Sequence, residues 1–328
     1  MFKIHWEKTS TSHPLAHNLI ERMVHLACPG QKLISHQLIE GGCANLNIKI
    51  NLEGVENPFI LRVYLWDKEA AFREKNLSIL LKNTLPLPTF YFIGNIDHYT
   101  FALTEFIRGI PLRDLLLSDL PHDRGAIMFD IGVLLSQIHK NTFPTAGFFD
   151  KNLAIIPPKN SDDLSTFARE CLDKNNVLAV LDQQTILSIK TCLNTFGHLF
   201  PDKNENCLVH GDFDPANILV DQTDHTWKVK GILDWEFSFS GSPLWDVANM
   251  LRYSAQMPPD FEDSFIRGLT CNGKSLPENW HSTIHLLNLV SLLDILRKEN
   301  HKPFPHRCED IHRLINNIIE KLSQTQIS

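Results

Sequence analysis

The sequence predicts an α+β fold of two lobes, in which a small antiparallel β-sheet with one helix precedes a larger, mainly helical part. Two observations support this prediction. Short runs of strand-forming residues, separated by turn residues, fill much of the first third of the chain. After Gly109 these signals nearly vanish, and apolar residues recur three and four positions apart, as on the buried face of a helix. We therefore expect an N-terminal lobe of residues 1–106 and a C-terminal lobe of residues 107–328.

Size and composition limit the classes of protein. The chain has 328 residues, 43% of them hydrophobic and 21% charged, and its net charge of −7 argues against binding nucleic acid by phosphate neutralisation. The seven cysteines include no Cys-x-x-Cys pair, and no apolar run approaches the roughly 18 residues that would cross a bilayer. The N-terminus lacks the apolar core of a signal peptide. We expect a cytoplasmic protein without a nucleic-acid or membrane partner; the oligomeric state is not predicted.

The first third of the chain contains the predicted sheet. A helix is expected first, then strands on both sides of a glycine turn, then a strand, a helix and two more strands. In order, these elements are Pro14–Leu26, Lys32–Ile39, Leu46–Ile50, Phe59–Tyr64, Asp67–Lys82, Thr89–Gly94 and Tyr99–Phe106. Gly41 and Gly42 lie in the turn, just before Asn45. By itself this pattern fits an ordinary hairpin turn equally well.

One cation interrupts the apolar strand Phe59–Tyr64. Arg62 stands there, and Glu74 on the following helix is a candidate partner, with Glu69 as the rival. The simpler interpretation is an arginine on an edge strand that points into water, with both glutamates on the solvated face of the helix.

The remainder of the chain is predicted to be mainly helical. Helical spacing or composition marks its segments, which are Pro111–Leu117, His122–His139, two helices within Leu164–Leu199, Gly241–Leu251, Asp260–Leu269, Trp280–Lys298 and Cys308–Leu322. Trp280–Lys298 is apolar nearly all round and is therefore expected to be buried. We interpret His139 and Asp246 as structural, with Asp246 tying its helix to a polar loop upstream. The acidic residues Asp260, Glu262, Asp263 and Asp294 are read as solvated rather than as contacts of a cationic substrate.

That polar loop lies between two short apolar strands. Leu208 and Val209 precede it, Ile218–Val220 follow it, and the loop carries His210, Asp212 and Asn217. Carboxylates are costly between buried strands unless they have a function. A second strand, from Trp227, ends in the acidic run Asp234-Trp-Glu236.

Together these motifs resemble the aminoglycoside phosphotransferase family, whose members include antibiotic kinases and choline-kinase-like and homoserine-kinase-like enzymes. The resembling motifs are His-Gly-Asp-Phe-Asp-Pro-Ala-Asn-Ile-Leu at 210–219 and Ile-Leu-Asp-Trp-Glu at 232–236, and the likeness extends from about Leu38 to about Tyr253. The His-x-Asp-x4-Asn spacing is also that of the catalytic loop of protein kinases. One departure is Asp214, where many members of the family carry His.

The resemblance implies a protein-kinase-like fold, with ATP or GTP and Mg²⁺ as cofactors, and a role for each matching residue. Asp212 would accept the proton of a small-molecule hydroxyl, and Asn217 and Asp234 would bind Mg²⁺. The acceptor could be an aminoglycoside-like antibiotic, an amino alcohol or a sugar. The nucleotide would be bound by the glycine turn and its surroundings and by the connector between the lobes, that is by Gly41, Gly42, Asn45, Arg62, Glu74, the carbonyl of Glu105 and the amide of Ile107.

Three other functions compete with this interpretation. The first is a nucleotide-binding regulatory protein of the same fold that has lost catalysis, which the joint presence of Asp212, Asn217 and Asp234 disfavours. The second is a metal-dependent hydrolase with His210, Asp212 and Asp234 as ligands, which leaves the glycine turn and Arg62 without a role. The third is a kinase that acts on proteins, which the absence of an Asp-Phe-Gly triplet after the second motif disfavours.

Overall fold

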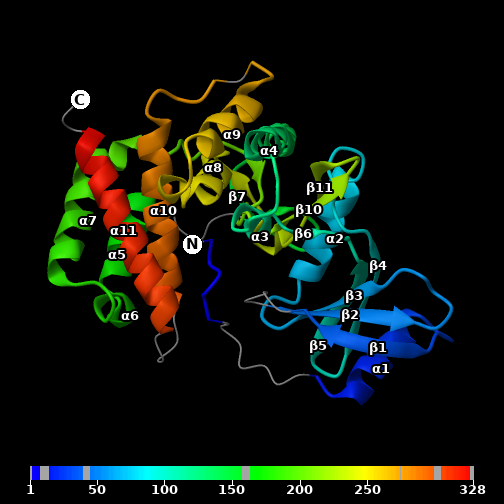
Figure 1. The fold of residues 1–328 in the computed structure, drawn as a ribbon. Coiled ribbons are helices and arrows are strands. Elements are labelled where there is room, and N and C mark those ends of the chain that lie inside the picture. The colour runs from blue at the N-terminus through cyan, green and yellow to red at the C-terminus, as the bar shows by residue number, and fades with distance from the viewer. Residues whose placement is uncertain are drawn as a thin grey trace.

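The computed structural model describes residues 2–7, 15–39, 45–156, 163–273, 275–298 and 304–325. It confirms the predicted α+β fold with a sheet-containing N-terminal part and a mainly helical C-terminal part. In Figure 1 the five-stranded sheet lies at one side of the molecule, and the helices of the second half of the chain lie at the other. The boundary at 106/107 stays a prediction.

The N-terminal lobe is built on an antiparallel sheet with the strand order β1-β2-β3-β5-β4. The strands are β1 (Leu33–Leu38), β2 (Leu46–Leu52), β3 (Phe59–Tyr64), β4 (Phe90–Ile96) and β5 (Tyr99–Glu105). Each was predicted to within a few residues. Burial alternates along β2, as expected for a strand with one face on the core.

Two helices cover opposite faces of this sheet. On α1 (His17–Ala27), the side chains of Ile20, Met23 and Val24 are buried against one face, in a cluster that includes Leu61 and Val63 of β3. On α2 (Ala70–Leu81), Ala70 and Ala71 pack with Tyr64 and Ala102, which belong to the other face because neighbouring residues of a strand point in opposite directions. On β3, α2 can therefore reach Tyr64 and Arg62, which lie two positions apart and share that face.

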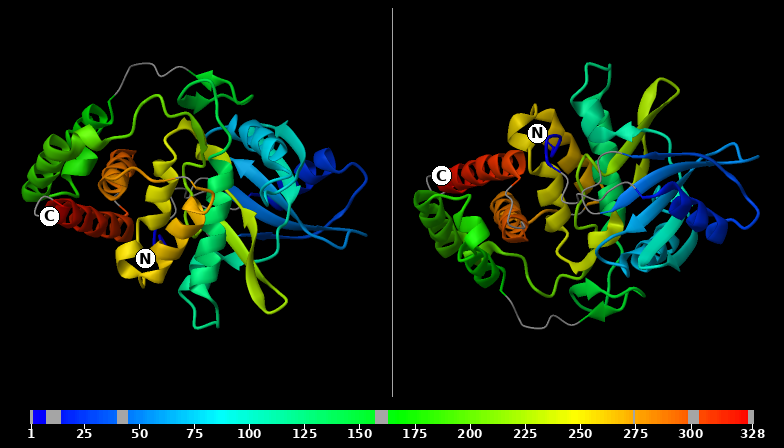
Figure 2. Two further views of the ribbon diagram at one scale, coloured as in Figure 1. Left: turned by 90° about the horizontal axis from the view of Figure 1, so that it is seen from above. Right: turned by 90° about the horizontal axis from the view of Figure 1, so that it is seen from below.

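The C-terminal lobe contains most of the helices. They are α3 (Leu112–Leu116), α4 (Arg124–Ile138), α5 (Leu164–Leu172), α6 (Asn175–Leu178), α7 (Gln183–Phe196), α8 (Leu244–Leu251), α9 (Asp260–Thr270), α10 (Trp280–Lys298) and α11 (Pro305–Thr325), with 3₁₀ turns at Gly197–Leu199, Trp235–Phe237 and Ser254–Gln256. As predicted, α10 is buried along most of its length. In both views of Figure 2, α10 (orange) lies beside α11 (red), at the side of the molecule away from the five-stranded sheet.

Two small sheets complete this lobe. One has the order β11-β10-β6, from β6 (Ile110–Pro111), β10 (Ile218–Thr223) and β11 (Thr226–Ile232). The other has the order β8-β7-β12-β9, from β7 (Gly147–Phe149), β8 (Ile155–Ile156), β9 (Cys207–Val209) and β12 (Phe239–Gly241). Neither β7 nor β8 was predicted from the sequence, because strands of two or three residues are too short to show a period.

Helices α4 and α9 approach each other closely through glycines. A Cβ atom on Gly132 would lie 2.1 Å from the carbonyl oxygen of Phe265, and one on Gly268 would lie 2.1 Å from that of Phe129. Side chains at these two positions would separate the helices, so the crossing depends on both glycines.

We expect Gly268→Ala to lower the free energy of unfolding by about 1–3 kcal/mol, the usual cost of forcing extra volume into a packed interior. Denaturant unfolding followed by circular dichroism would measure it. Gly197→Ala is the matched control, since its Cβ would meet only the Ser165 side chain, at 3.5 and 3.8 Å, and its φ of −56° suits alanine. Equal stability of the two variants would contradict this account of the crossing.

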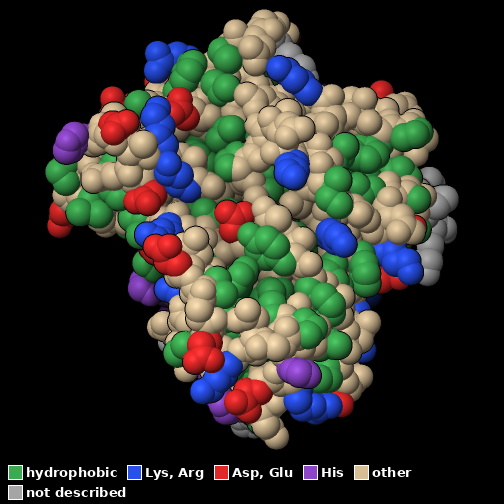
Figure 3. Space-filling model, turned by 90° about the vertical axis from the view of Figure 1, so that its right-hand side faces the viewer, with side chains coloured by type: hydrophobic (Ala, Val, Ile, Leu, Met, Phe, Trp, Pro, Cys, Tyr) green, Lys and Arg blue, Asp and Glu red, His purple; other side chains and the backbone are tan. Residues whose placement is uncertain are grey.

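The distribution of charge on the surface does not indicate a particular kind of binding partner. On the face drawn in Figure 3, the basic and acidic side chains of the described residues are scattered rather than gathered in one patch. Among the described helices, none has the length and apolar character required to cross a membrane.

Candidate active site

The β10–β11 hairpin brings the two acidic motifs together. The polar loop begins after β9, and its last residue, Asn217, precedes β10, while Asp234 follows β11. Ile218 pairs with Ile232, and the Leu233 amide donates to the Asn217 carbonyl oxygen at 2.8 Å. Asp234 has a left-handed backbone, with φ of 61°. Two residues 17 positions apart in the sequence thus lie at adjacent ends of one hairpin.

The buried side chain of Asp246 fixes the backbone of the polar loop. From the first turn of α8, its Oδ2 accepts from the amide of His210 at 2.9 Å, and its Oδ1 accepts from the amide of Gly211 at 3.0 Å. The His139 ring contacts the same carboxylate at 3.2 Å and is 3% exposed. These contacts confirm the structural roles that the sequence predicted for Asp246 and His139.

Gly211 allows the loop to pass close to the chain after Asp234. Its φ is +86°, and a Cβ atom there would lie 2.4 Å from the carbonyl oxygen of Phe237. A side chain at this position would therefore be strained and would also push the loop from the turn that carries Asp234.

Asp212 is held at both carboxylate oxygens. Its Oδ1 lies 2.8 Å from Lys3 Nζ, and its Oδ2 accepts from Asn217 Nδ2 at 3.0 Å. Burial by itself raises the pKa of Asp212, but the charge and hydrogen bond of Lys3, together with the nearby Arg252 and His210, outweigh that effect, so the pKa lies below its usual value. Asp212 is therefore a carboxylate at neutral pH, with a fixed orientation.

Arg62 lies at the centre of a buried ionic cluster. It contacts Glu74 at 3.2 Å, Asp234 at 2.6 Å and Glu236 at 3.2 Å, and it is 8% exposed. The alternative of a solvent-facing arginine is wrong, and so is Glu69 as its partner, because Glu69 is exposed. The cluster joins β3 and α2 of the N-terminal lobe to the turn after β11.

Two residues hold the turn that carries Asp234 and Glu236. Asn45 donates to Glu236 Oε1 at 2.9 Å and accepts from the Leu65 amide at 3.2 Å. Arg73, on α2, donates from Nε and Nη2 to the carbonyl oxygen of Glu236 at 3.1 and 2.9 Å. Asn45 was predicted as a phosphate contact; here its side chain lies against the acidic run.

Glu236 and Lys3 were not predicted as site residues. Glu236 belongs to the quoted acidic motif, so its position two residues after Asp234 was an available signal. Lys3 lies in a segment without any motif, and its contact with Asp212 spans 209 positions. No local pattern could have predicted that contact.

Glu236 introduces a pH dependence of stability. Burial raises its pKa to about 7; Arg62 opposes that shift, and the carboxylates of Glu74 and Asp234 add to it. Between its usual value of 4.5 and about 7, the folded protein keeps a proton that the unfolded chain releases. This group therefore lowers the free energy of unfolding as the pH rises through that interval.

We expect Glu236→Gln to remove this contribution. In protein free of metal and nucleotide, the stability of wild type should fall relative to that of the variant between about pH 4.5 and 7. Urea unfolding at several pH values would measure the difference. Parallel curves for the two proteins would show that Glu236 has an ordinary pKa.

The remaining predicted nucleotide contacts lie in three places. Gly41 and Gly42 fall outside the described residues. Glu105 ends β5, where it pairs with Phe59, and its carboxylate accepts from the Thr89 amide at 3.2 Å. Ile107 lies against Gly231 of β11, since a Cβ atom on that glycine would meet the Ile107 side chain at 2.9 Å. The connector is thus close to the hairpin that bears Asp234.

Asn217 and Asp234 are better suited to binding Mg²⁺ together with phosphates and water than to holding a metal ion by protein ligands alone. No group of three or more His, Cys, Asp or Glu side chains that could hold a metal occurs in the described part of the chain. Asn217 has its amide nitrogen on Asp212, so its amide oxygen is the atom that can bind a cation, and Asp234 adds a carboxylate that is 28% exposed. Two hard oxygen ligands, completed by phosphates and water, are typical of Mg²⁺ sites.

The same cluster can accept an anion. Within the ranges that the structure describes, Arg62 Nε is buried and has no hydrogen-bond partner. A phosphate oxygen could use this donor, and a cation near Asp234 could replace Arg62 in the Asp234 ion pair.

His210 does not fit the hydrolase alternative. It is fully buried, its Nε2 contacts the carbonyl oxygen of Leu233 at 2.9 Å, and its Nδ1 accepts from the amide of Asp212 at 3.2 Å. Both ring nitrogens are occupied by the backbone, so His210 shapes the loop and is not available as a metal ligand.

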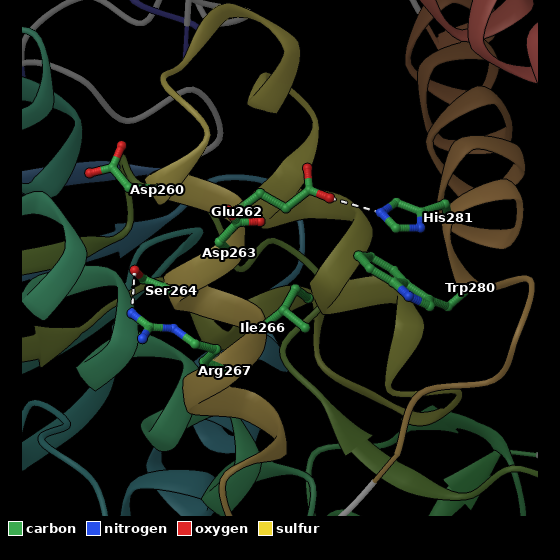
Figure 4. A pocket seen from close by; sticks show the side chains of 8 residues that line it. All are labelled: Asp260, Glu262, Asp263, Ser264, Ile266, Arg267, Trp280 and His281. Carbon is green, nitrogen blue, oxygen red and sulfur yellow. Dashed lines mark hydrogen bonds and ion pairs between the residues drawn. The ribbon is translucent and has the colours of Figure 1, made fainter.

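A surface pocket of about 660 Å³ is lined by residues of α9 and α10, none of which is a predicted site residue (Figure 4). Glu262 contacts His281 there at 2.9 Å, and the Trp280 ring stacks on the His281 ring at a centroid distance of 3.6 Å. Asp260 pairs with Arg124. Glu262 and Asp260 therefore have protein partners.

Three features characterise this protein: a two-lobed fold, a polar loop whose Asp212 is held in place, and an acidic turn whose carboxylates pair with Arg62 of β3. Residues 35–282, more than half of the chain, match the phosphotransferase enzyme family (APH). The chain belongs to this family, and the resemblance seen in the sequence is confirmed.

Solved structures show the same fold. A thermostable mutant of the aminoglycoside phosphotransferase APH(4)-Ia, in ternary complex with AMP-PNP and hygromycin B, is 17% identical, with a TM-score of 0.67 and coverage of 94% of this chain and 98% of that chain. The choline kinase LicA from Streptococcus pneumoniae is 15% identical, with a TM-score of 0.63 and coverage of 93% and 98%.

Curated relatives match over part of their length. "Acyl-CoA dehydrogenase family member 11" of Gallus gallus is 45% identical over 149 residues, which are 45% of this chain and 18% of that protein. Hydroxylysine kinase of Xenopus laevis is 26% identical over 183 residues, which are 52% of this chain and 45% of that protein. The chain thus spans less than half the length of these two relatives.

Proposed function

We propose that this chain transfers the γ-phosphate of ATP, or of GTP, to a hydroxyl group of a small molecule, with Mg²⁺ as cofactor. One observation carries the proposal: Asp212 is a fixed carboxylate that accepts from Asn217, and the hairpin that follows Asn217 brings that residue next to Asp234 in the fold. Membership of the phosphotransferase enzyme family supports it.

Each residue has a role in this reaction. Asp212 orients the acceptor hydroxyl and takes its proton while the hydroxyl oxygen bonds to the γ-phosphorus and the bond to the bridging oxygen of the nucleoside diphosphate breaks. Asn217 and Asp234 would hold Mg²⁺, which neutralises phosphate charge when bound. Arg62, fixed by Glu74, would contact the phosphates. Gly41, Gly42, Glu105 and Ile107 remain the proposed nucleotide contacts of the glycine turn and the connector.

The acceptor class follows from the relatives and remains a proposal. Among the similar proteins, one was solved in complex with hygromycin B, one is a choline kinase and one is a hydroxylysine kinase. We therefore include aminoglycoside-like antibiotics, amino alcohols and sugars as candidate acceptors. We propose that the protein is located in the reducing cytoplasm, which supplies ATP and GTP.

A screen for acceptor-dependent ADP or GDP release would test this function. Hydroxylated amines, sugars and aminoglycosides would be assayed with ATP and with GTP, with Mg²⁺ and with excess chelator, and Asp212→Ala would serve as the blank. We expect at least one acceptor to raise release above the blank, and only with Mg²⁺. Nucleotide binding without any acceptor-dependent turnover would instead support the regulatory alternative.

A further inference from the structure

The beginning of the chain is packed into the C-terminal lobe. Phe2 is 2% exposed, and its ring centroid lies 5.2 Å from that of Tyr253 and 6.1 Å from that of Phe261. Phe2 and Lys3 have φ angles of 47° and 60°, a conformation that residues other than glycine keep only where their surroundings impose it. We call residues 2–7 the N-terminal segment; Figure 1 shows it in dark blue near the centre of the molecule.

The other end of the N-terminal segment is fixed to α11. Trp6 Nε1 donates to Asp310 Oδ2 at 2.9 Å. The Glu7 carboxylate accepts from the backbone amides of His306 and Arg307, at 2.9 and 3.0 Å, at the helix N-terminus. A carboxylate at this position satisfies free amides and opposes the helix dipole. The segment is therefore held on both sides of Lys3.

These anchors place the Lys3 ammonium between two carboxylates of the catalytic loop. Its Nζ lies 2.8 Å from Asp212 Oδ1 and also forms an ion pair with Asp214 Oδ2. The Lys3 side chain is 16% exposed and that of Asp214 is 8% exposed. Without Lys3, two carboxylates two positions apart would lie together in a poorly solvated site and would repel each other.

We propose that Lys3 is a positioning residue of the phosphoryl-transfer site, which orients Asp212 toward the acceptor hydroxyl and offsets the charge of Asp214. The inference rests on the proposed function. With Lys3 on Oδ1 and Asn217 on Oδ2, the Asp212 carboxylate has one orientation. A carboxylate oxygen accepts more than one hydrogen bond, so Oδ1 still has room for the hydroxyl.

The first test compares Lys3→Met and Lys3→Arg with the matched control Lys190→Met, which removes an exposed lysine on α7. We expect Lys3→Met to lower kcat about 10- to 100-fold, because charge-assisted hydrogen bonds contribute on this scale. The KM for the nucleotide should stay unchanged. Lys3→Arg should restore much of the turnover, and Lys190→Met should match wild type.

The second test adds Asp214→Asn to Lys3→Met. If the loss comes from uncompensated charge, the double variant should recover about tenfold in kcat relative to Lys3→Met alone. General misfolding would not be repaired in this way. An unchanged kcat in Lys3→Met, an increased kcat with a lower acceptor KM, or a double variant no better than the single one would each overturn the proposal. The second of these would show that the N-terminal segment blocks the site.

Thermal unfolding of the same proteins separates this inference from the proposed function. Lys3→Met should lower Tm, and Asp214→Asn should restore part of the loss, whether or not an acceptor has been found. Strictly additive changes in Tm would overturn the charge compensation. Failure of every acceptor with wild type would overturn the proposed function and leave this measurement intact.

Discussion

Asp212→Asn should lower kcat for phosphoryl transfer about 100- to 10,000-fold, the usual contribution of a general base. The amide has the size of the carboxylate and can still accept from Asn217, but it cannot take a proton from the acceptor hydroxyl. Nucleotide affinity should change little, because Asp212 is not among the proposed nucleotide contacts. Coupled ADP release and titration calorimetry with a non-hydrolysable nucleotide would measure the two quantities.

The control for this substitution is Asp224→Asn. Asp224 is exposed in the turn between β10 and β11, and its φ of 50° suits asparagine as well as aspartate. This variant should have the turnover of wild type. Equal turnover in Asp212→Asn and wild type would remove Asp212 from the reaction and support the regulatory alternative.

Arg62→Met should lower the free energy of unfolding by about 3–5 kcal/mol at pH 8, because removing one partner from a buried ionic cluster leaves unpaired charges. Burial raises the pKa of both Glu74 and Glu236, against the charge of Arg62. Without Arg62, these carboxyls can take up protons more easily as the pH falls. The loss of stability should therefore be smaller at pH 5 than at pH 8, and chemical denaturation at the two pH values would show the difference.

Two control variants test the prediction for Arg62→Met. Arg62→Lys keeps the charge but not the planar fork, so it should lose less stability than Arg62→Met. Arg22→Met breaks an ion pair with Asp97 in which both side chains are about half exposed, and it should leave stability nearly unchanged. A loss in Arg62→Met no greater than that in Arg22→Met would contradict the importance of the buried cluster.

The sequence predicted the elements whose pattern is long enough to show a period. The helix Trp280–Lys298 was predicted with its exact bounds, and β3 (Phe59–Tyr64) likewise. Elements without a period were missed: β7 and β8 have three and two residues, and α6 has four. Such elements form because their neighbours supply hydrogen-bond partners, which a local pattern does not show.

The candidate site also has a part that could be predicted from the sequence and a part that could not. Asp212, Asn217 and Asp234 could be predicted because the first two lie in one polar loop and the third ends the hairpin that follows it. The pairing of Arg62 with Glu74 could be predicted because a strand and the next helix along the chain carry them. The contacts of Arg62 with Glu236 and of Lys3 with Asp212 span 174 and 209 positions. They depend on how the lobes and the N-terminal segment pack, and nothing in the sequence near either residue indicates them.

The pair of Arg62 and Asp234 has a consequence for motion. Arg62 belongs to β3 and Asp234 follows β11, so their 2.6 Å contact joins the five-stranded sheet to the β10–β11 hairpin. A ligand that binds either side chain in place of its partner breaks this ion pair. The binding of such a ligand and the freedom of the sheet to move against the helices are then thermodynamically linked, and each must alter the other by the same free energy.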